Sequence, residues 1–132
     1  MVLRNHKGEA IVGMAGLLDN VLDATTAEAL ALLRGLEFLE KLGCQSVCIE
    51  SDSLELIQAC TGVIEIWSPY SAILAECFLK ASTMNIASLQ LCPRDANQVA
   101  HELAKHAYQM KVQLEWDGDT PDFILPFVVI MM

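Results

Sequence analysis

Two carboxylates and one imidazole are the side chains whose types and positions could support chemistry. Asp52 follows the short apolar run 47–49, Glu28 lies near the start of a long segment with helical spacing, and His101 lies near the start of the last such segment. Ligands of open α/β sheets lie beyond the carboxyl ends of strands. Carboxylate oxygens suit a hard cation such as Mg²⁺. A metal-dependent reaction is therefore one interpretation, although spacing alone does not show that these groups meet.

Each of the three residues also has a structural interpretation. Thr25 and Glu28 stand three apart, as in a capping box, and Asp52 with Glu55 repeats that pattern at the next helix. His101 could be a partly exposed helix residue. On spacing alone, these structural roles are the more frequent ones.

The elements that would position these residues follow from hydrophobic periodicity and turn signals. In chain order we predict a hairpin within 1–17, a helix over 23–42, a strand over 46–50, helices over 53–60 and 68–82, a strand over 86–92 and a helix over 97–113. The strand over 46–50 looks buried on both faces, as in parallel sheets. Strand–helix alternation after a hairpin predicts an α/β fold with a mixed sheet flanked by helices.

Length and composition limit the possible classes of protein. The chain has 132 residues, which favours one domain, and 54% of them are hydrophobic, which allows a packed core. The net charge of −9, with only eight Lys and Arg, opposes a strong sequence-independent grip on nucleic acid. Any such contact must be local, weak or metal-bridged.

Membrane and secretion signals are weak. The C-terminal apolar run 123–132 (FILPFVVIMM) is half the length of a bilayer span, which needs about 20 residues. The N-terminal segment MVLRNHKGEA lacks the apolar stretch of a secretion signal. We expect a soluble intracellular protein, with nucleus and cytoplasm not distinguished.

The five cysteines include no CxxC pair, so we expect reduced thiols rather than a metal cluster or disulfide framework. Three of them, Cys48, Cys77 and Cys92, lie in apolar runs and are expected to be buried.

Four segments in order resemble successive blocks of a ribonuclease H-like domain. They are VLRNHKGEAI, TTAEALALLRGLEFLEKLG, VCIESDSLELI and LCPRDANQVAHELAKHA, which together cover about residues 2–108. The most similar branch is the plant retrotransposon type, often called reverse transcriptase-like. The segment WDGDTPDFI (116–124) is similar to the C-terminal tail of that branch. We therefore expect an RNase H-like domain over 1–115 and a tail over 116–132.

The resemblance implies a hydrolase that cuts the RNA strand of an RNA–DNA hybrid with Mg²⁺ or Mn²⁺. Glu28 and Asp52 match the AE and ESDS motifs, so both would be catalytic metal ligands. His101 stands where active ribonucleases place a last Asp, and imidazole is a poorer Mg²⁺ ligand than carboxylate. Arg94 and Asn97 precede the last helix, where family members approach the nucleic acid.

The resemblance also has a departure at its start. The family's first strand, which carries its first metal-binding Asp, and most of its second strand have no counterpart here. We therefore expect an N-terminally truncated domain that binds metal weakly and has little or no activity. Its sheet would have unpaired edges, each a row of open N–H and C=O groups. The apolar tail could fill an edge, a partner chain could lend a strand, or the chain could be a fragment, which is the interpretation we favour.

Two other classes of function stay open at this point. One is a degenerate, non-catalytic module for weak nucleic-acid or protein contacts, which the charge of −9 and His101 favour. The other is an unrelated small α/β domain with three ordinary helix caps, which a structure with Glu28 and Asp52 pointing apart would favour.

Overall fold

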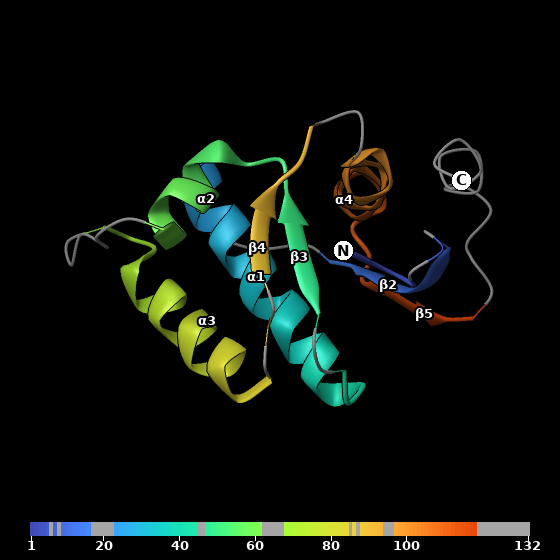
Figure 1. Cartoon of the computed structure of the whole chain (residues 1–132). Helices are drawn as coiled ribbons and strands as arrows, with labels where there is room; N and C mark the ends of the chain where they lie inside the picture. The colour runs from blue at the N-terminus through green and yellow to red at the C-terminus, as the bar shows by residue number, and fades with distance from the viewer. Residues whose placement is uncertain are drawn as a thin grey trace. The chain divides into compact units, whose positions relative to one another are not determined.

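The computed structural model describes residues 1–5, 7, 9–16, 23–44, 47–61, 68–84, 86, 88–93 and 97–118 (Figure 1). The chain divides into two compact units. Unit 1 comprises Met1–Leu17 and Pro93–Met132, and unit 2 comprises Leu18–Cys92. The C-terminal run 123–132, proposed above as an edge strand, lies outside the described residues. No helix among the described ranges is both long and apolar enough to cross a membrane.

Unit 1 contains an antiparallel sheet with the strand order β1-β2-β5. The strands are β1 (Val2–Arg4), β2 (Ala10–Ala15) and β5 (Leu114–Asp117). The turn between β1 and β2 is held by Asn5, whose side-chain oxygen accepts hydrogen bonds from the N–H groups of Lys7 at 2.9 Å and Glu9 at 3.1 Å. The predicted hairpin is therefore confirmed. The strand β5 was not predicted, and the expected domain boundary at residue 115 falls inside it.

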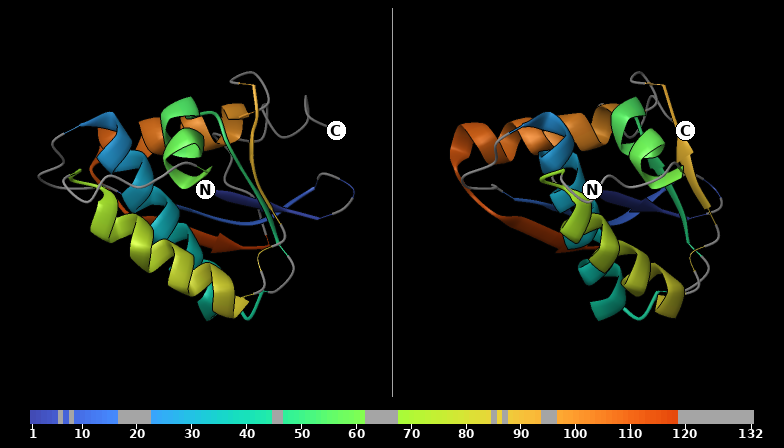
Figure 2. Two further views of the ribbon diagram at one scale, coloured as in Figure 1. Left: turned by 60° about the vertical axis from the view of Figure 1, so that its left-hand side comes forward. Right: turned by 90° about the vertical axis from the view of Figure 1, so that its left-hand side faces the viewer.

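Helix α4 (Gln98–Met110) packs against β2 and supplies most of the core of unit 1. Figure 2 shows this helix along its length in two views. Its buried residues recur at four-residue spacing, which places them on one face. They join Ala15 in one cluster: Val99, Leu103 and Ala107. The helix ends at Lys111, whose left-handed backbone (φ 53°) stops it.

Gly13 and Trp116 are register partners between β2 and β5. A Cβ atom at position 13 would overlap the indole ring, coming within 2.6 Å of Cζ2. The ring thus lies over the glycine backbone, in space that any side chain would fill. This contact joins the unpredicted strand β5 to β2.

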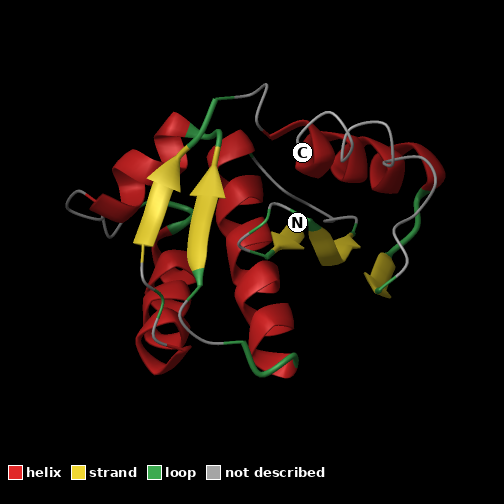
Figure 3. Cartoon of the chain, turned by 45° about the vertical axis from the view of Figure 1, so that its right-hand side comes forward, coloured by secondary structure: helices red, strands yellow, loops and turns green. Residues whose placement is uncertain are grey.

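Unit 2 contains the parallel pair β3 (Cys48–Ser51) and β4 (Ser88–Leu91), shown as adjacent arrows in Figure 3. Its helices are α1 (Ala24–Lys41), α2 (Leu54–Thr61) and α3 (Ser71–Met84). Helices α1 and α3 lie side by side, as both views of Figure 2 show. A buried cluster takes one side chain from each helix: Ala29, Leu56 and Leu74.

The α/β fold class predicted from the sequence is confirmed. The described strands form two sheets, one antiparallel and one parallel, rather than one continuous mixed sheet. The prediction that β3 is buried on both faces is wrong. Cys48 and Glu50 lie on one, exposed face, and Ile49 and Ser51 are half-buried on the other. All five cysteines are free thiols; Cys77 and Cys92 are buried, and Cys48 is exposed.

The N-terminus is built into the edge of unit 1. The Met1 ammonium donates a hydrogen bond to the Met14 carbonyl at 2.8 Å, and the Met14 N–H donates to the Met1 carbonyl at 3.0 Å. Burial lowers the pKa of this ammonium to about 6 from its ordinary value of 8.0. The folded state therefore favours the neutral amine.

The Gly13 contact predicts a steric penalty that depends on position. Gly13→Ala should lower the free energy of unfolding by about 1–3 kcal/mol, because Trp116 must move to admit a methyl group. Gly16→Ala is the matched control, since its Cβ would meet only Gln113 Cγ at 3.8 Å and should change stability by less than about 0.5 kcal/mol. Urea unfolding of both variants measures the change in the free energy of unfolding. Equal stabilities would show that the Trp116 ring does not occupy that space.

The buried N-terminus predicts a pH dependence of stability. Because the unfolded chain binds a proton near pH 8 and the folded chain only near pH 6, stability should rise as pH rises through this window, by up to about 3 kcal/mol. Urea unfolding at pH 6 and pH 8 measures the rise. N-terminal acetylation removes the titrating group, so the acetylated chain should lose this part of the pH dependence. Identical pH profiles for the two chains would refute the burial.

Candidate functional site

Glu28 lies in the second turn of α1 and does not cap it. The N-cap is Asp23, whose side-chain oxygen accepts a hydrogen bond from the Thr26 N–H at 2.7 Å. Its extended backbone (φ −153°, ψ 168°) is the N-cap conformation, so the helix begins at Ala24. The predicted capping box between Thr25 and Glu28 is therefore wrong, because the helix starts too early for Glu28 to reach its end.

Asp52 lies between β3 and α2 and does not cap α2 either. The side-chain oxygen of Ser53 accepts from the Leu56 N–H at 3.2 Å, which makes Ser53 the capping residue. The Ser51 hydroxyl oxygen accepts from the Ser53 N–H at 3.1 Å, which closes the turn around Asp52. Ser51 and Ser53 thus provide the local hydrogen bonds, and the half-buried Asp52 carboxylate does not cap α2.

The start of α1 is joined to the start of α2 by polar and apolar contacts. The Thr25 hydroxyl donates a hydrogen bond to the Glu55 carboxylate, so Glu55 does not complete a capping box with Asp52. One turn further along, Ala29 of α1 packs with Leu56 of α2 in the buried cluster of unit 2. These contacts bring the helix carrying Glu28 next to the strand end carrying Asp52.

The acidity of Glu28 is affected by its burial and by the charge of Asp52. Glu28 is half-buried, and this burial raises its pKa above the ordinary value of 4.5. The negative charge of Asp52 raises the pKa of Glu28 further. Such coupling opposes the interpretation in which the two side chains point apart.

The Cys92 thiol is also affected by nearby negative charges. Burial raises the pKa of the Cys92 thiol, and the charges of Glu50 and then Asp52 raise it further. Cys92 directly follows β4, and its N–H donates to the Ser51 carbonyl at 2.8 Å. The carboxyl ends of β3 and β4 therefore form one acidic edge. Sequence spacing did not indicate Cys92, because its proximity depends on the pairing of β3 with β4.

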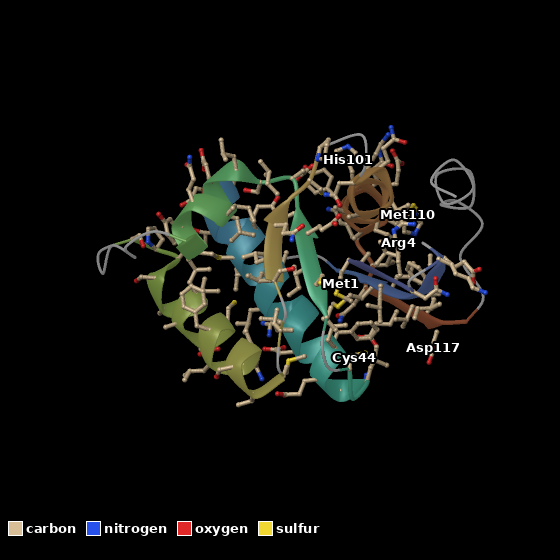
Figure 4. All side chains as sticks on the ribbon, in the orientation of Figure 1. Met1, Arg4, Cys44, His101, Met110 and Asp117 are labelled. Carbon is tan, nitrogen blue, oxygen red and sulfur yellow. The ribbon has the colours of Figure 1, made fainter. Side chains whose placement is uncertain are left out.

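The other predicted site residues lie in unit 1 or outside the described residues. His101 is exposed in the first turn of α4 and is labelled in Figure 4. Asn97 precedes α4 and is half-buried, and its side chain makes no capping hydrogen bond. Arg94 falls outside the described residues. Across the described residues, no group of three or more His, Cys, Asp or Glu side chains is arranged to hold a metal ion.

The coupling between the carboxylates predicts a measurable change in acidity. Asp52→Asn should lower the pKa of Glu28 relative to the unmodified chain, while burial keeps it above the ordinary value. A carboxyl group whose pKa is raised by folding stabilises the folded state below pH 4.5, and this stabilisation is lost as the pH rises through the pKa of the folded state. The Asp52→Asn chain should therefore lose less free energy of unfolding over this pH range than the unmodified chain. Carbon-13 NMR titration of the Glu28 carboxyl measures the shift.

Glu50→Gln is the control for this titration, because it removes a charge from β3, two residues before Asp52, at a residue that is not among the causes of the raised pKa of Glu28. If Asp52→Asn and Glu50→Gln left the pKa of Glu28 equally unchanged, the two carboxylates would not be neighbours.

Comparison with known proteins identifies the domain. A family model described as "Reverse transcriptase-like" matches residues 1–107, which is most of the chain. No curated protein and no solved structure matches. The match includes both units, the carboxylates at positions 28 and 52, and α4 as far as its last buried alanine. The chain therefore belongs to the reverse transcriptase-like family, and its domain is RNase H-like.

Proposed function

We propose that this RNase H-like domain binds an RNA–DNA hybrid and holds a divalent cation, Mg²⁺ or Mn²⁺, between Glu28 and Asp52. The supporting observation is the electrostatic coupling of these carboxylates at the acidic edge of β3 and β4. The donor set fits a hard cation, since both ligands are carboxylate oxygens. A cation between them would also cancel the repulsion that raises the pKa of Glu28.

The residues of the chain would divide the work as follows. Glu28 and Asp52 would hold the cation in their ionised forms, and half-burial would keep bulk water from competing for their oxygens. When bound, the cation lowers the pKa of a water molecule and stabilises negative charge on a phosphate. Ser53 and Asp23, as caps, fix the two elements from which the carboxylates project.

We further propose that the polypeptide 1–132 hydrolyses hybrids slowly or not at all. Two-metal phosphodiester cleavage needs ligands for a pair of ions. Among the described residues, no group of three or more His, Cys, Asp or Glu side chains is arranged to hold a metal ion, so Glu28 and Asp52 would act without a third ligand of these types. The net charge of −9 also repels the phosphate backbone, so hybrid binding at the carboxylate pair must depend on the cation.

A second candidate function is a non-catalytic module for weak nucleic-acid or protein contacts. It is favoured by the same net charge, and by the β3–β4 sheet, whose outer edges pair with no other described strand, since an unpaired strand edge can pair with a partner chain. Uptake of a divalent cation separates this candidate from the first, because the module would not need one.

Calorimetric titration with Mn²⁺ tests the proposed cation site. The unmodified chain should bind Mn²⁺ weakly, with a Kd on the order of 1 mM, because few charged ligands form the site. Glu28→Gln and Asp52→Asn should each abolish the binding. Glu50→Gln is the matched control and should retain it, since Glu50 is an exposed carboxylate on the same strand. A chain that takes up no Mn²⁺ would support the non-catalytic module instead.

The same samples, mixed with a labelled RNA–DNA hybrid, test the proposed low activity. We expect cation-dependent binding and no measurable cleavage. Robust cleavage that is lost in both Glu28→Gln and Asp52→Asn would contradict low activity while supporting the site.

A further inference from the structure

The outward face of α4 carries a row of basic and aromatic side chains. Because Val99, Leu103 and Ala107 face the core, residues offset from them by half a turn face outward. His101, Lys105 and Tyr108 follow at i, i+4 and i+7, all are exposed, and Lys111 is exposed at the end of the helix. We call these four residues the outer stripe of α4. Figure 4 labels His101, in the first turn of α4, and Met110, its last residue.

The outer stripe of α4 is positive in an acidic protein. Residues 97–113 contain two Lys and two His but one acid, Glu102, whereas the whole chain has a net charge of −9. Two cations elsewhere are neutralised by ion pairs: Arg34 pairs with Glu37 at 3.1 Å, and Lys80 with Glu40 at 3.2 Å. Lys105 and Lys111 form no ion pair with another described residue. Their charge is therefore available to an anionic ligand.

Tyr108 gives the stripe an aromatic surface. It is 74% exposed, the highest value among the large hydrophobic residues described. Leaving an aromatic ring in water forgoes a large hydrophobic gain, which a ligand with a flat face would recover. Unpaired nucleobases stack on such rings, and adjacent cations contact the phosphates. A duplex offers no free base faces along its length, so the aromatic ring favours a single strand.

The spacing of the stripe fits this ligand. At 1.5 Å per residue, Lys105 lies about 8 Å along the helix from Met110, the last residue of α4, and Lys111 follows directly as the C-cap; this span is roughly the rise of two to three stacked nucleotides. Tyr108 lies between them in sequence and height. The negative end of the helix dipole near Lys111 and the overall acidity both oppose an anion, so we expect binding that is weak and salt-sensitive.

We propose that the outer stripe of α4 is a binding surface for single-stranded nucleic acid, with Tyr108 stacking on a base and Lys105 and Lys111 contacting phosphates. This surface lies in unit 1 and is independent of the carboxylate pair in unit 2. It extends the proposed hybrid binding to an unpaired strand and does not require the cation.

Fluorescence anisotropy with labelled oligothymidylate at low ionic strength tests this proposal on the full chain. Tyr108→Ala should weaken binding at least about fivefold, the lower end of the effect of losing one base stack, while Tyr108→Phe should retain most of it. Lys105→Gln and Lys111→Gln should each reduce the slope of log K against log salt by about 0.7, as expected for one lost phosphate contact. Thermal melts confirm that these exposed substitutions leave the fold intact.

Control variants test whether oligothymidylate binding depends on the outer stripe of α4. Lys7→Gln removes an exposed lysine from the hairpin of the same unit, and Phe78→Ala removes a partly exposed aromatic ring from α3; neither should change binding. Asp52→Asn should also bind oligothymidylate normally, which separates this proposal from the cation site.

Three results would overturn the proposal. One is the absence of oligothymidylate binding by the unmodified chain at low salt. Another is an equal loss in Lys7→Gln and Lys105→Gln, which would indicate a diffuse charge effect. The third is self-association in sedimentation that Tyr108→Ala abolishes without changing oligothymidylate binding, since the stripe would then be an interface between two copies of the chain.

Discussion

Repulsion between the carboxylates of Glu28 and Asp52 is the constraint on which this account depends. The fold holds one of them half-buried within reach of the other's charge, which makes ionisation of Glu28 unfavourable. A protein selected only for stability would separate such groups or place a cationic side chain between them. Burial and the charge of Asp52 both raise the pKa of Glu28, and we propose that a divalent cation is the ligand that offsets their effect.

The packing of unit 2 provides the stability that offsets this repulsion. Ala29 lies one residue after Glu28 and is fully buried with Leu56 and Leu74. Asp23 and Ser53 take over the capping of the helices near the site, at a gain of about 1 kcal/mol each. Because Asp23 and Ser53 cap these helices, capping does not explain the positions of Glu28 and Asp52.

Sequence reasoning located the helices and the order of elements because hydrophobic spacing is a local property. It failed at β5, a four-residue segment with alternating polar residues whose strand state depends on pairing with β2 about a hundred positions earlier. It also assigned the caps to the wrong residues. Thr25 and Asp52 fit the capping pattern as well as Asp23 and Ser53 do, and only the hydrogen bonds of the folded chain distinguish them. The effect of Asp52 on the pKa of Glu28 depends on the packing of α1 against α2, and the spacing of residues in the sequence does not predict this packing.

The acidity of Glu28 with and without Mg²⁺ tests the central claim most directly. A carbon-13 titration of its carboxyl group in excess Mg²⁺ should give a lower pKa than the same titration with chelator, because a shared cation stabilises both ionised carboxylates. Identical titration curves in the two conditions would contradict the account, since a cation held by Glu28 and Asp52 must change the acidity of the group it contacts.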